Sequence, residues 1–206
     1  MSHSKDLLLI FTRNPELGKC KTRLAATVGD ETALDIYKFL LEHTHKISQG
    51  LQTDKWVCYS QEIWENDIWE SSIYQKKLQS GEDLGERMSN AFKKGFEAGH
   101  QKIIIIGSDI YDLSETDIQD AFLKLEEHDY VIGPAIDGGY YLLGMTYYDP
   151  SLFEDKPWGT DRVLELTLED LKNKNYTLLP PKNDIDYFED IKDNKTFHPF
   201  FINKNI

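Results

Sequence analysis

Residues 102–109 read KIIIIGSD, with four isoleucines in a row ahead of glycine, serine and aspartate. A continuous β-branched run of this kind predicts a strand that is buried on both faces, as in a parallel sheet. Residues 7–12, LLLIFT, form a second apolar run with the same character. Strands of this type need helices on both faces of the sheet, so the two runs together favour an α/β fold.

Segments with helical patterning alternate with these strands along the chain. Helices are expected over residues 30–47, 86–98, 115–127 (after the cap residue Ser114) and 160–174. Further strands are expected over residues 56–59, 130–132, 140–145 and 176–179. The pattern of residues 64–79 is ambiguous. The alternation predicts a three-layer, Rossmann-like α/β fold with a mostly parallel central sheet.

The length of 206 residues suits a single domain spanning 1–206, with a core over 7–191. The tail, 192–206, looks peripheral, and its phenylalanines Phe197, Phe200 and Phe201 are expected to pack it onto the core.

The chain carries 36 acidic and 23 basic residues, a formal net charge of -13. This balance argues against nucleic acid as a partner, because duplex binding needs broad basic surfaces. No apolar run approaches the roughly 20 residues that span a bilayer, and the N-terminal MSHSKD lacks the apolar core of a secretory signal. Two cysteines, Cys20 and Cys58, form no disulfide framework. We therefore expect a cytoplasmic protein with no membrane partner.

Positive charge gathers behind the first strand, in the segment RNPELGKCKTR over residues 13–23. Three cations, Lys19, Lys21 and Arg23, lie within five residues, Gly18 permits a sharp turn, and Arg13 opens the loop. An ordinary basic loop would explain the charges alone, but loops after parallel strands are where ligands bind. The segment lacks the glycines of a P-loop or of a dinucleotide fingerprint. Its position favours binding of phosphate groups.

Asp109 comes just past the tetra-isoleucine strand, near the same expected crevice. A carboxylate in this position is unfavourable unless it is paired, capped or bound to a cation. Beside a phosphate-binding loop it is a candidate ligand of Mg²⁺ or Mn²⁺, since hard divalent ions prefer oxygen donors. The alternative is an Asx turn, the role that we give to Asp112.

Residues 133–145, GPAIDGGYYLLGM, carry a glycine pair, Gly138 and Gly139, ahead of a predicted strand. Paired glycines allow a backbone or a ligand to come close. Asp137 before them could hydrogen-bond a sugar hydroxyl or act as a general base. The Asp-Gly pair is also a strong hairpin signal, and the two interpretations are compatible.

Two further segments are weaker candidates. Residues 79–88, QSGEDLGERM, place Gly81 and Gly85 before a helix, either as a capped turn or as a loop around a nucleotide base. Residues 183–190, NDIDYFED, offer Asp184 and Asp186, one of which could complete a metal site, although an acidic helix start explains them equally.

Several blocks of this sequence, taken in order, resemble one bacterial family. They are LIFTRNPELGKCKTRL, GEDLGERMSNAF, IIIIGSDIYDLSETDI, VIGPAIDGGYYLLGM and PWGTDRVLELTLEDL followed by DIDYFEDI, and they span residues 7–191. The family is the GT-A-like glycosyltransferase family often labelled arsenosugar-biosynthesis-type glycosyltransferase. The resemblance implies the nucleotide-diphospho-sugar transferase (GT-A) fold with a mixed, mostly parallel sheet, related to cofactor-forming nucleotidyltransferases.

The resemblance also implies roles for individual residues. The phosphates of a nucleotide or nucleotide sugar would contact the first loop, here Arg13, Gly18, Lys19, Lys21 and Arg23, and the base would lie by Gly81 and Gly85. A divalent metal, Mg²⁺ or Mn²⁺, would bind Asp109 and Asp186. A sugar or small-molecule acceptor would lie by Gly138, Gly139 and Trp158, with Asp137 as the candidate base.

The chain departs from the superfamily's usual motifs, because it has SDIYD in place of DxD and no GxG in the first loop. The reaction therefore stays open at this point. The alternatives are glycosyl transfer from a nucleotide sugar, nucleotidyl transfer with release of pyrophosphate, and a non-catalytic nucleotide-binding module. A homodimer is compatible with each of them.

Overall fold

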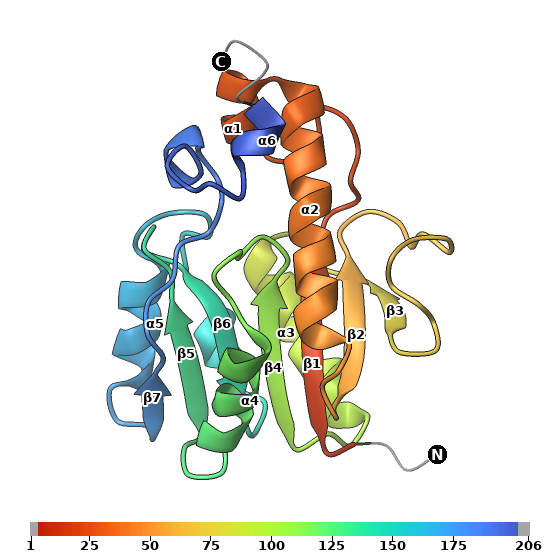
Figure 1. The fold of residues 1–206 in the computed structure, drawn as a ribbon. Helices are drawn as coiled ribbons and strands as arrows, with labels where there is room; N and C mark the ends of the chain where they lie inside the picture. The colour runs from red at the N-terminus through yellow and green to blue at the C-terminus, as the bar shows by residue number, and fades with distance from the viewer. Residues whose placement is uncertain (1–3, 202–206) are drawn as a thin grey trace.

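The computed structural model describes residues 4–201 and forms a seven-stranded sheet with helices on both faces (Figure 1). The strands are β1 (Asp6–Thr12), β2 (Asp54–Tyr59), β3 (Gln75–Leu78), β4 (Lys102–Gly107), β5 (Tyr130–Pro134), β6 (Tyr140–Met145) and β7 (Tyr176–Leu178). Their order is β3-β2-β1-β4-β6-β5-β7. Strand β6 runs antiparallel to β4 and β5, and the other pairs are parallel. The predicted mixed, mostly parallel sheet is confirmed.

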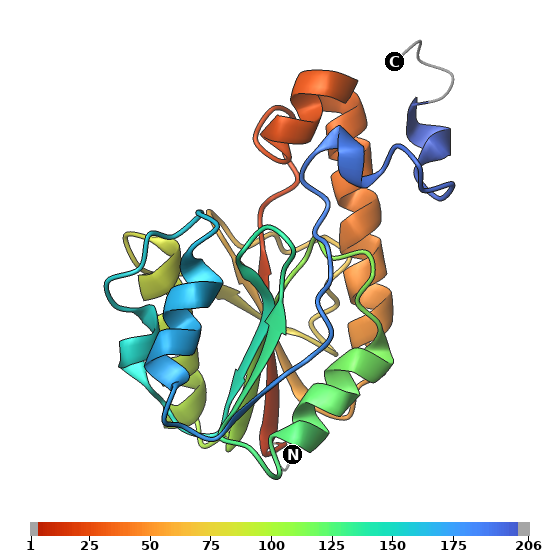
Figure 2. The same ribbon diagram turned by 90° about the vertical axis from the view of Figure 1, so that its left-hand side faces the viewer.

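The α-helices are α1 (Thr22–Val28), α2 (Asp30–Ser48), α3 (Leu84–Glu97), α4 (Glu115–Lys124), α5 (Val163–Leu171) and α6 (His198–Phe201). Two short 3₁₀ helices, η1 (Pro150–Phe153) and η2 (Phe188–Asp190), join later elements. Figure 2 shows α2 and α4 on one face of the sheet and α3 and α5 on the other. The three predicted layers are therefore confirmed. Among the described helices, none is long and apolar enough to cross a lipid bilayer.

The core forms on both faces of the central strands because their side chains alternate in direction. Leu8 of β1 and Ile104 of β4 belong to the apolar cluster that includes α2 and α4 side chains. Leu7 and Ile103 belong to the cluster on the α3 side. These side chains have no exposed surface, and burying each one stabilises the fold by about 1.5–3 kcal/mol. The continuous runs in the sequence are explained by this two-sided burial.

The strand order reverses at β1, which pairs with β2 on one side and with β4 on the other. Phe11 near the end of β1 lies opposite Gly107 at the end of β4. In open α/β sheets, ligands bind outside the carboxyl ends of the strands at such a switch point. The segments that follow β1 and β4 both start from this place.

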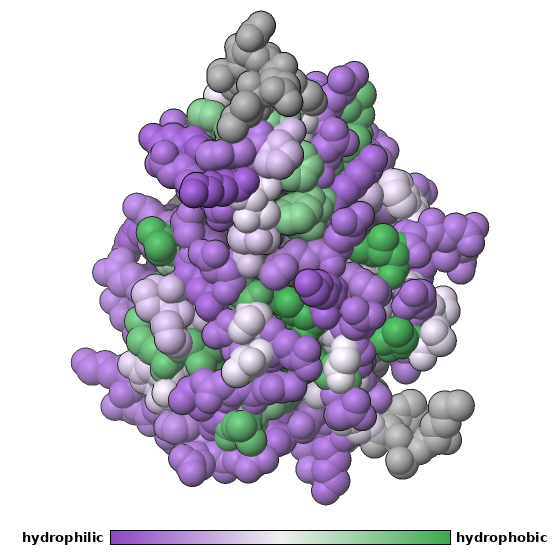
Figure 3. Space-filling model, viewed as in Figure 1, coloured by the Kyte–Doolittle hydropathy of each residue, from purple (hydrophilic) through white to green (hydrophobic). Residues whose placement is uncertain are grey.

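A third apolar cluster stands above the sheet, where α1, the first half of α2, η2 and α6 meet (Figures 1 and 2). Phe197 and Phe201 are buried in it, and Phe200 packs against it. The tail therefore packs through the three predicted phenylalanines, although onto α1 and α2 rather than onto the sheet. The face drawn in Figure 3 is largely hydrophilic, and its hydrophobic residues are scattered.

Several predicted boundaries were wrong. The helix expected over 160–174 is α5, Val163–Leu171, because residues 157–160 form a turn in which Thr160 N–H bonds to the carbonyl of Pro157, and residues 161–162 turn again before the helix begins. The helix expected through residue 127 ends at Lys124 and continues only as a turn. Helix α1 was not predicted, and Gly29, with φ 83°, separates it from α2. Strand β3 lies in the ambiguous region, since QKKL at the sheet edge shows no apolar alternation.

Candidate functional site

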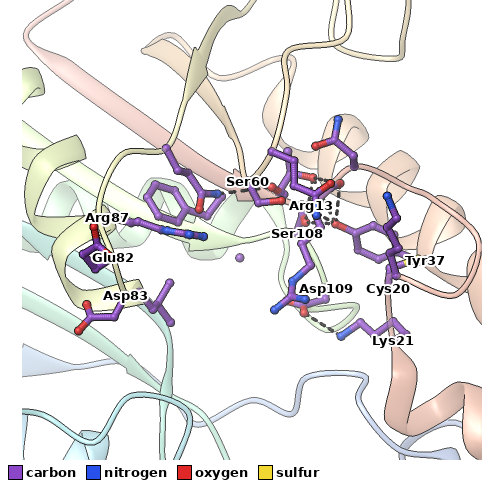
Figure 4. A pocket seen from close by; sticks show the side chains of 18 residues that line it. Arg13, Cys20, Lys21, Tyr37, Ser60, Glu82, Asp83, Arg87, Ser108 and Asp109 are labelled. Carbon is purple, nitrogen blue, oxygen red and sulfur yellow. Dashed lines mark hydrogen bonds and ion pairs between the residues drawn. The ribbon is translucent and has the colours of Figure 1, made fainter.

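A cavity of about 570 Å³ opens at the carboxyl ends of β1 and β4 (Figure 4). Four basic side chains line it, namely Arg13, Lys19, Lys21 and Arg87. We call this cavity the cationic half of the cleft. Arg87 reaches toward it from α3, opposite Arg13 and Lys21 (Figure 4). Glu82 and Asp83 lie at its α3 end, where Asp83 caps the helix by accepting a hydrogen bond from Glu86 N–H.

Lys21 and Asp109 meet in this half of the cleft, although 88 positions separate them in the sequence. The Lys21 ammonium donates to Asp109 Oδ2 at 2.7 Å, and its side chain is only 6% exposed. Burial opposes the charge of the ammonium, but the attraction of Asp109 outweighs burial and raises the pKa of Lys21. Lys21 has a left-handed backbone, with φ 50°, at the start of α1. The loop after β1 and the carboxylate after β4 therefore face the same cavity.

Three hydroxyl groups tie the two loops together at the floor of the cationic half. The Tyr37 hydroxyl of α2 accepts a hydrogen bond from Arg13 N–H at 2.9 Å and lies 3.3 Å from both Thr12 Oγ1 and Ser108 Oγ. Burial raises the pKa of Tyr37, so the hydroxyl stays protonated. This network was missed in the sequence, where Tyr37 appears only as one member of an apolar helix face.

A second cavity of about 220 Å³ adjoins the first and shares Phe11, Leu84, Gly107 and Asp109 with it. Its other lining residues include the side chains Met88, Tyr140, Trp158 and Val163. Its charged residues are Asp109, Asp137 and Asp184, and no described lysine or arginine belongs to its lining. We call this cavity the acidic half of the cleft.

Asp184 faces the two other carboxylates of the acidic half. Burial raises its pKa to about 6, with repulsion from Asp109 and Asp137 as the next causes. The neighbouring Ile185 N–H bonds to the carbonyl of Asp109 at 3.2 Å, which fixes this segment against the end of β4. Asp186, by contrast, forms an ion pair with Arg23.

This donor set fits a hard divalent cation. Mg²⁺ commonly binds through one or two carboxylates together with substrate phosphates, rather than through a complete protein cage. In keeping with that mode, residues 4–201 contain no ready group of three metal-ligating His, Cys, Asp or Glu side chains. Asp109 and Asp184 supply two carboxylates whose repulsion a cation would relieve. The metal role of Asp186 stays a prediction, and the geometry favours its alternative, Asp184.

Two of the predicted glycines allow close contacts with other parts of the chain rather than with a ligand. A Cβ on Gly85 would lie 2.1 Å from Trp158 Nε1, and one on Gly138 would lie 2.1 Å from the carbonyl oxygen of Asp161. Gly85 therefore lets Trp158 pack onto the start of α3, and Gly138 lets the turn before α5 approach the β5–β6 hairpin. That hairpin confirms the Asp-Gly turn signal.

The structure places the predicted site residues in three groups. The cationic half includes Arg13, Lys19, Lys21 and Asp109. The acidic half includes Asp109, Asp137, Gly139 and Trp158. Outside both linings lie Gly18, Arg23, Gly81, Gly85, Gly138 and Asp186.

A family profile described as an uncharacterized protein conserved in bacteria, DUF2064, matches residues 44–160. A crystal structure from Desulfovibrio desulfuricans G20, provisionally named a nucleotide-diphospho-sugar transferase, is 31% identical to the chain. The match covers 95% of this chain and 90% of that one, with a TM-score of 0.84. The chain belongs to the DUF2064 family. Comparison with curated protein sequences gives no match.

More distant structures share the fold of this DUF2064 protein. A cytidylyltransferase from Leptospira borgpetersenii has a TM-score of 0.52 at 18% identity, over 90% of this chain and 80% of that one. A CMP:2-keto-3-deoxy-manno-octonic acid synthetase in complex with CTP has a TM-score of 0.53 at 9% identity, over 92% and 96%. The predicted nucleotide-diphospho-sugar transferase fold is thereby confirmed.

Proposed function

We propose that this DUF2064 protein is a metal-dependent glycosyltransferase that uses a nucleotide-diphospho-sugar donor and a small-molecule acceptor. The observation that carries the proposal is the division of one cleft into two halves of opposite character, which meet at Asp109. The diphosphate would bind in the cationic half, and the sugar and its acceptor in the acidic half. The transferred carbon would then lie close to Asp109.

The residues of the cationic half suit a departing diphosphate. Lys21 is held beside Asp109, and Arg13 is fixed through its backbone by Tyr37. Charges that are already oriented stabilise developing negative charge without reorganising during the reaction. A Mg²⁺ or Mn²⁺ ion held by Asp109 and Asp184 would supply further neutralisation of the diphosphate oxygens.

The acidic half fits an uncharged sugar and an acceptor without a phosphate group. A phosphorylated acceptor, as nucleotidyl transfer to a phosphorylated small molecule requires, needs cations near the phosphate. The described lining contains none and instead offers three carboxylates and an apolar wall. Carboxylates can accept hydrogen bonds from sugar hydroxyls, and Asp137 is the candidate base for the acceptor hydroxyl.

Nucleotidyl transfer is the second candidate, because cytidylyltransferases are found among the structures of this fold. One fold supports both reactions, so the reaction products must distinguish glycosyl transfer from nucleotidyl transfer.

The experiment is an incubation of the protein and Mg²⁺ with nucleotide sugars or with nucleoside triphosphates, followed by ³¹P NMR. Each donor is paired with a neutral acceptor and with its phosphorylated counterpart. We expect a nucleoside diphosphate to form with a neutral acceptor. Pyrophosphate formed from a nucleoside triphosphate and the phosphorylated acceptor would instead establish nucleotidyl transfer.

A further inference from the structure

A third cavity, of about 360 Å³, lies between the edge strand β3 and helix α3. Its floor is formed by Trp56 and Cys58 of β2, which are both buried. Lys77 of β3 forms one wall, and Lys94 of α3 forms the other. We call this cavity the edge pocket. It shares Gln79 and Arg87 with the cationic half and no lining residue with the acidic half.

The edge pocket is lined by three cations, Lys77, Arg87 and Lys94, and by no acidic residue of the described chain. None of the three forms an ion pair within residues 4–201, whereas Lys21 and Lys76 each pair with an aspartate. Such a gathering is unexpected in a protein of net charge -13. Like charges that converge repel one another, and a bound anion removes that cost.

Lys77 and Lys94 are exposed side chains that border the same pocket. Lys77 Nζ lies 4.8 Å from the centroid of the Trp56 ring, and Lys94 Nζ donates to Ser80 Oγ at 3.1 Å. Burial raises the pKa of the Cys58 thiol to about 12, and the positive charges of Lys77 and Lys94 act against that rise. Both ammonium groups are therefore close enough to act on one buried sulfur.

A donor at the floor also lacks a partner. Trp56 is 7% exposed, and its Nε1 is buried without a hydrogen-bond acceptor among the described residues. An indole N–H can only donate, and leaving a buried donor unpaired is unfavourable. An oxyanion in the edge pocket would lie against the Trp56 ring and supply countercharge to the lysines.

We propose that the edge pocket binds a small phosphate-bearing molecule, at a site separate from the nucleotide cleft. The cations would contact the phosphate oxygens, while the Trp56 ring and Ala91 would contact an apolar part of the ligand. Gln79 and Arg87 line both the edge pocket and the cationic half. A ligand in the edge pocket would therefore adjoin the nucleotide. The proposal does not depend on the reaction that the cleft catalyses.

The test uses inorganic phosphate as the probe and the indole N–H signals of the four tryptophans as reporters, in ¹⁵N–¹H spectra of the full chain. The Trp56 signal is identified by its loss in Trp56→Phe. We expect a saturable shift of this signal in the wild type at constant ionic strength. In Lys77→Ala/Lys94→Ala, the apparent Kd should rise at least tenfold. The control Lys93→Ala/Lys172→Ala, which removes two exposed lysines outside the edge pocket, should bind as the wild type does.

Lys21→Met separates the edge pocket from the cleft. The Trp56 response to phosphate should persist in this variant, because Lys21 lines only the cationic half. Loss of the response in Lys21→Met would overturn the proposal, since phosphate would then be binding in the cleft alone. A Trp56 signal that stays fixed in the wild type, or that shifts equally in Lys77→Ala/Lys94→Ala, would overturn it as well.

Discussion

The cationic and acidic halves of the cleft share four lining residues, yet they present opposite charges to a ligand. In the cationic half, buried Lys21 is held in place by Asp109. In the acidic half, burial raises the pKa of Asp184 to about 6, and repulsion from Asp109 and Asp137 adds to the rise. The difference shows that two adjoining cavities of one cleft can have linings of opposite charge. It also makes Asp109 the residue on which both halves depend.

The largest effect is expected from Asp109→Asn, which removes the charge common to both halves. The neutral amide would leave Lys21 without its carboxylate partner and weaken the metal site, so turnover should fall on the order of 100-fold or more. Asp112→Asn, three residues along and exposed, is the matched control and should retain activity. Initial rates of donor consumption measure both variants. Full activity of Asp109→Asn would show that the reaction does not depend on the carboxylate that the two halves share.

Lys21→Met tests the cationic half alone. Loss of a buried, oriented ammonium should raise the Kd for a nucleoside diphosphate by roughly 10- to 100-fold, as measured by titration calorimetry. Lys19→Met is the control, because its side chain is 56% exposed and pairs with Glu16. A surface pair of this kind contributes at most about 1 kcal/mol. Equal losses in the two variants would indicate general electrostatic attraction rather than a built phosphate site.

Asp149, outside the cleft, is a fully partnered carboxylate to compare with Asp184. Burial opposes its charge, but hydrogen bonds from Lys174, Ser151 and Tyr130 outweigh burial and lower its pKa to about 2 from an ordinary value of 3.8. Because the folded pKa is the lower one, the stabilisation is complete above about pH 5 and is lost as pH falls through 3.8 toward 2.

Asp149→Asn should therefore lower the free energy of unfolding by about 2 kcal/mol at pH 7 and by far less near pH 2. Urea unfolding at a series of pH values measures the difference between variant and wild type. A difference that stays constant across this range would mean that Asp149 titrates normally in the folded protein.

The smallest effect is expected from Gly85→Ala, which acts on the acidic half through Trp158. The added Cβ would lie 2.1 Å from Trp158 Nε1 and must displace that ring. The KM for the acceptor should rise about tenfold, equivalent to about 1.4 kcal/mol, while the Kd for the nucleoside diphosphate stays unchanged. Trp158→Ala should have the same effect.

Gly50→Ala serves as the control for Gly85→Ala, since the nearest atom to its added Cβ is 3.6 Å away. An equal change in nucleotide affinity and acceptor KM in Gly85→Ala would contradict the separation of the two halves.

The fold was largely predictable because its strongest signals are local. The apolar runs of β1 and β4 and the cap at Ser114 each depend on a few adjacent residues. Predictions failed where tertiary contacts decide, as at the start of α5, where the turn at 160–162 packs against Gly138. Strand β3 was not assigned because an exposed edge strand needs no apolar pattern.

The site was predictable only in part, for the same reason. Lys21 and Asp109 follow β1 and β4, so the sequence predicted that they lie near one crevice. In the structure the Lys21 ammonium lies 2.7 Å from Asp109 Oδ2. Tyr37 was missed because its hydroxyl bonds to residues that are distant in the sequence, Arg13 and Ser108. The sequence shows only its place on a helix face. Neither could the sequence separate Asp184 from Asp186, two residues apart, because only the structure shows that Asp184 lines the acidic half and that Asp186 pairs with Arg23.

The most direct test of the divided cleft is a crystal structure with a nucleoside diphosphate and Mn²⁺, in which anomalous scattering locates the metal. We expect an anomalous peak at the Asp109 carboxylate, with the diphosphate on the side of Lys21 and Arg13. A diphosphate bound among Asp137, Tyr140 and Trp158, or manganese bound away from Asp109, would contradict it.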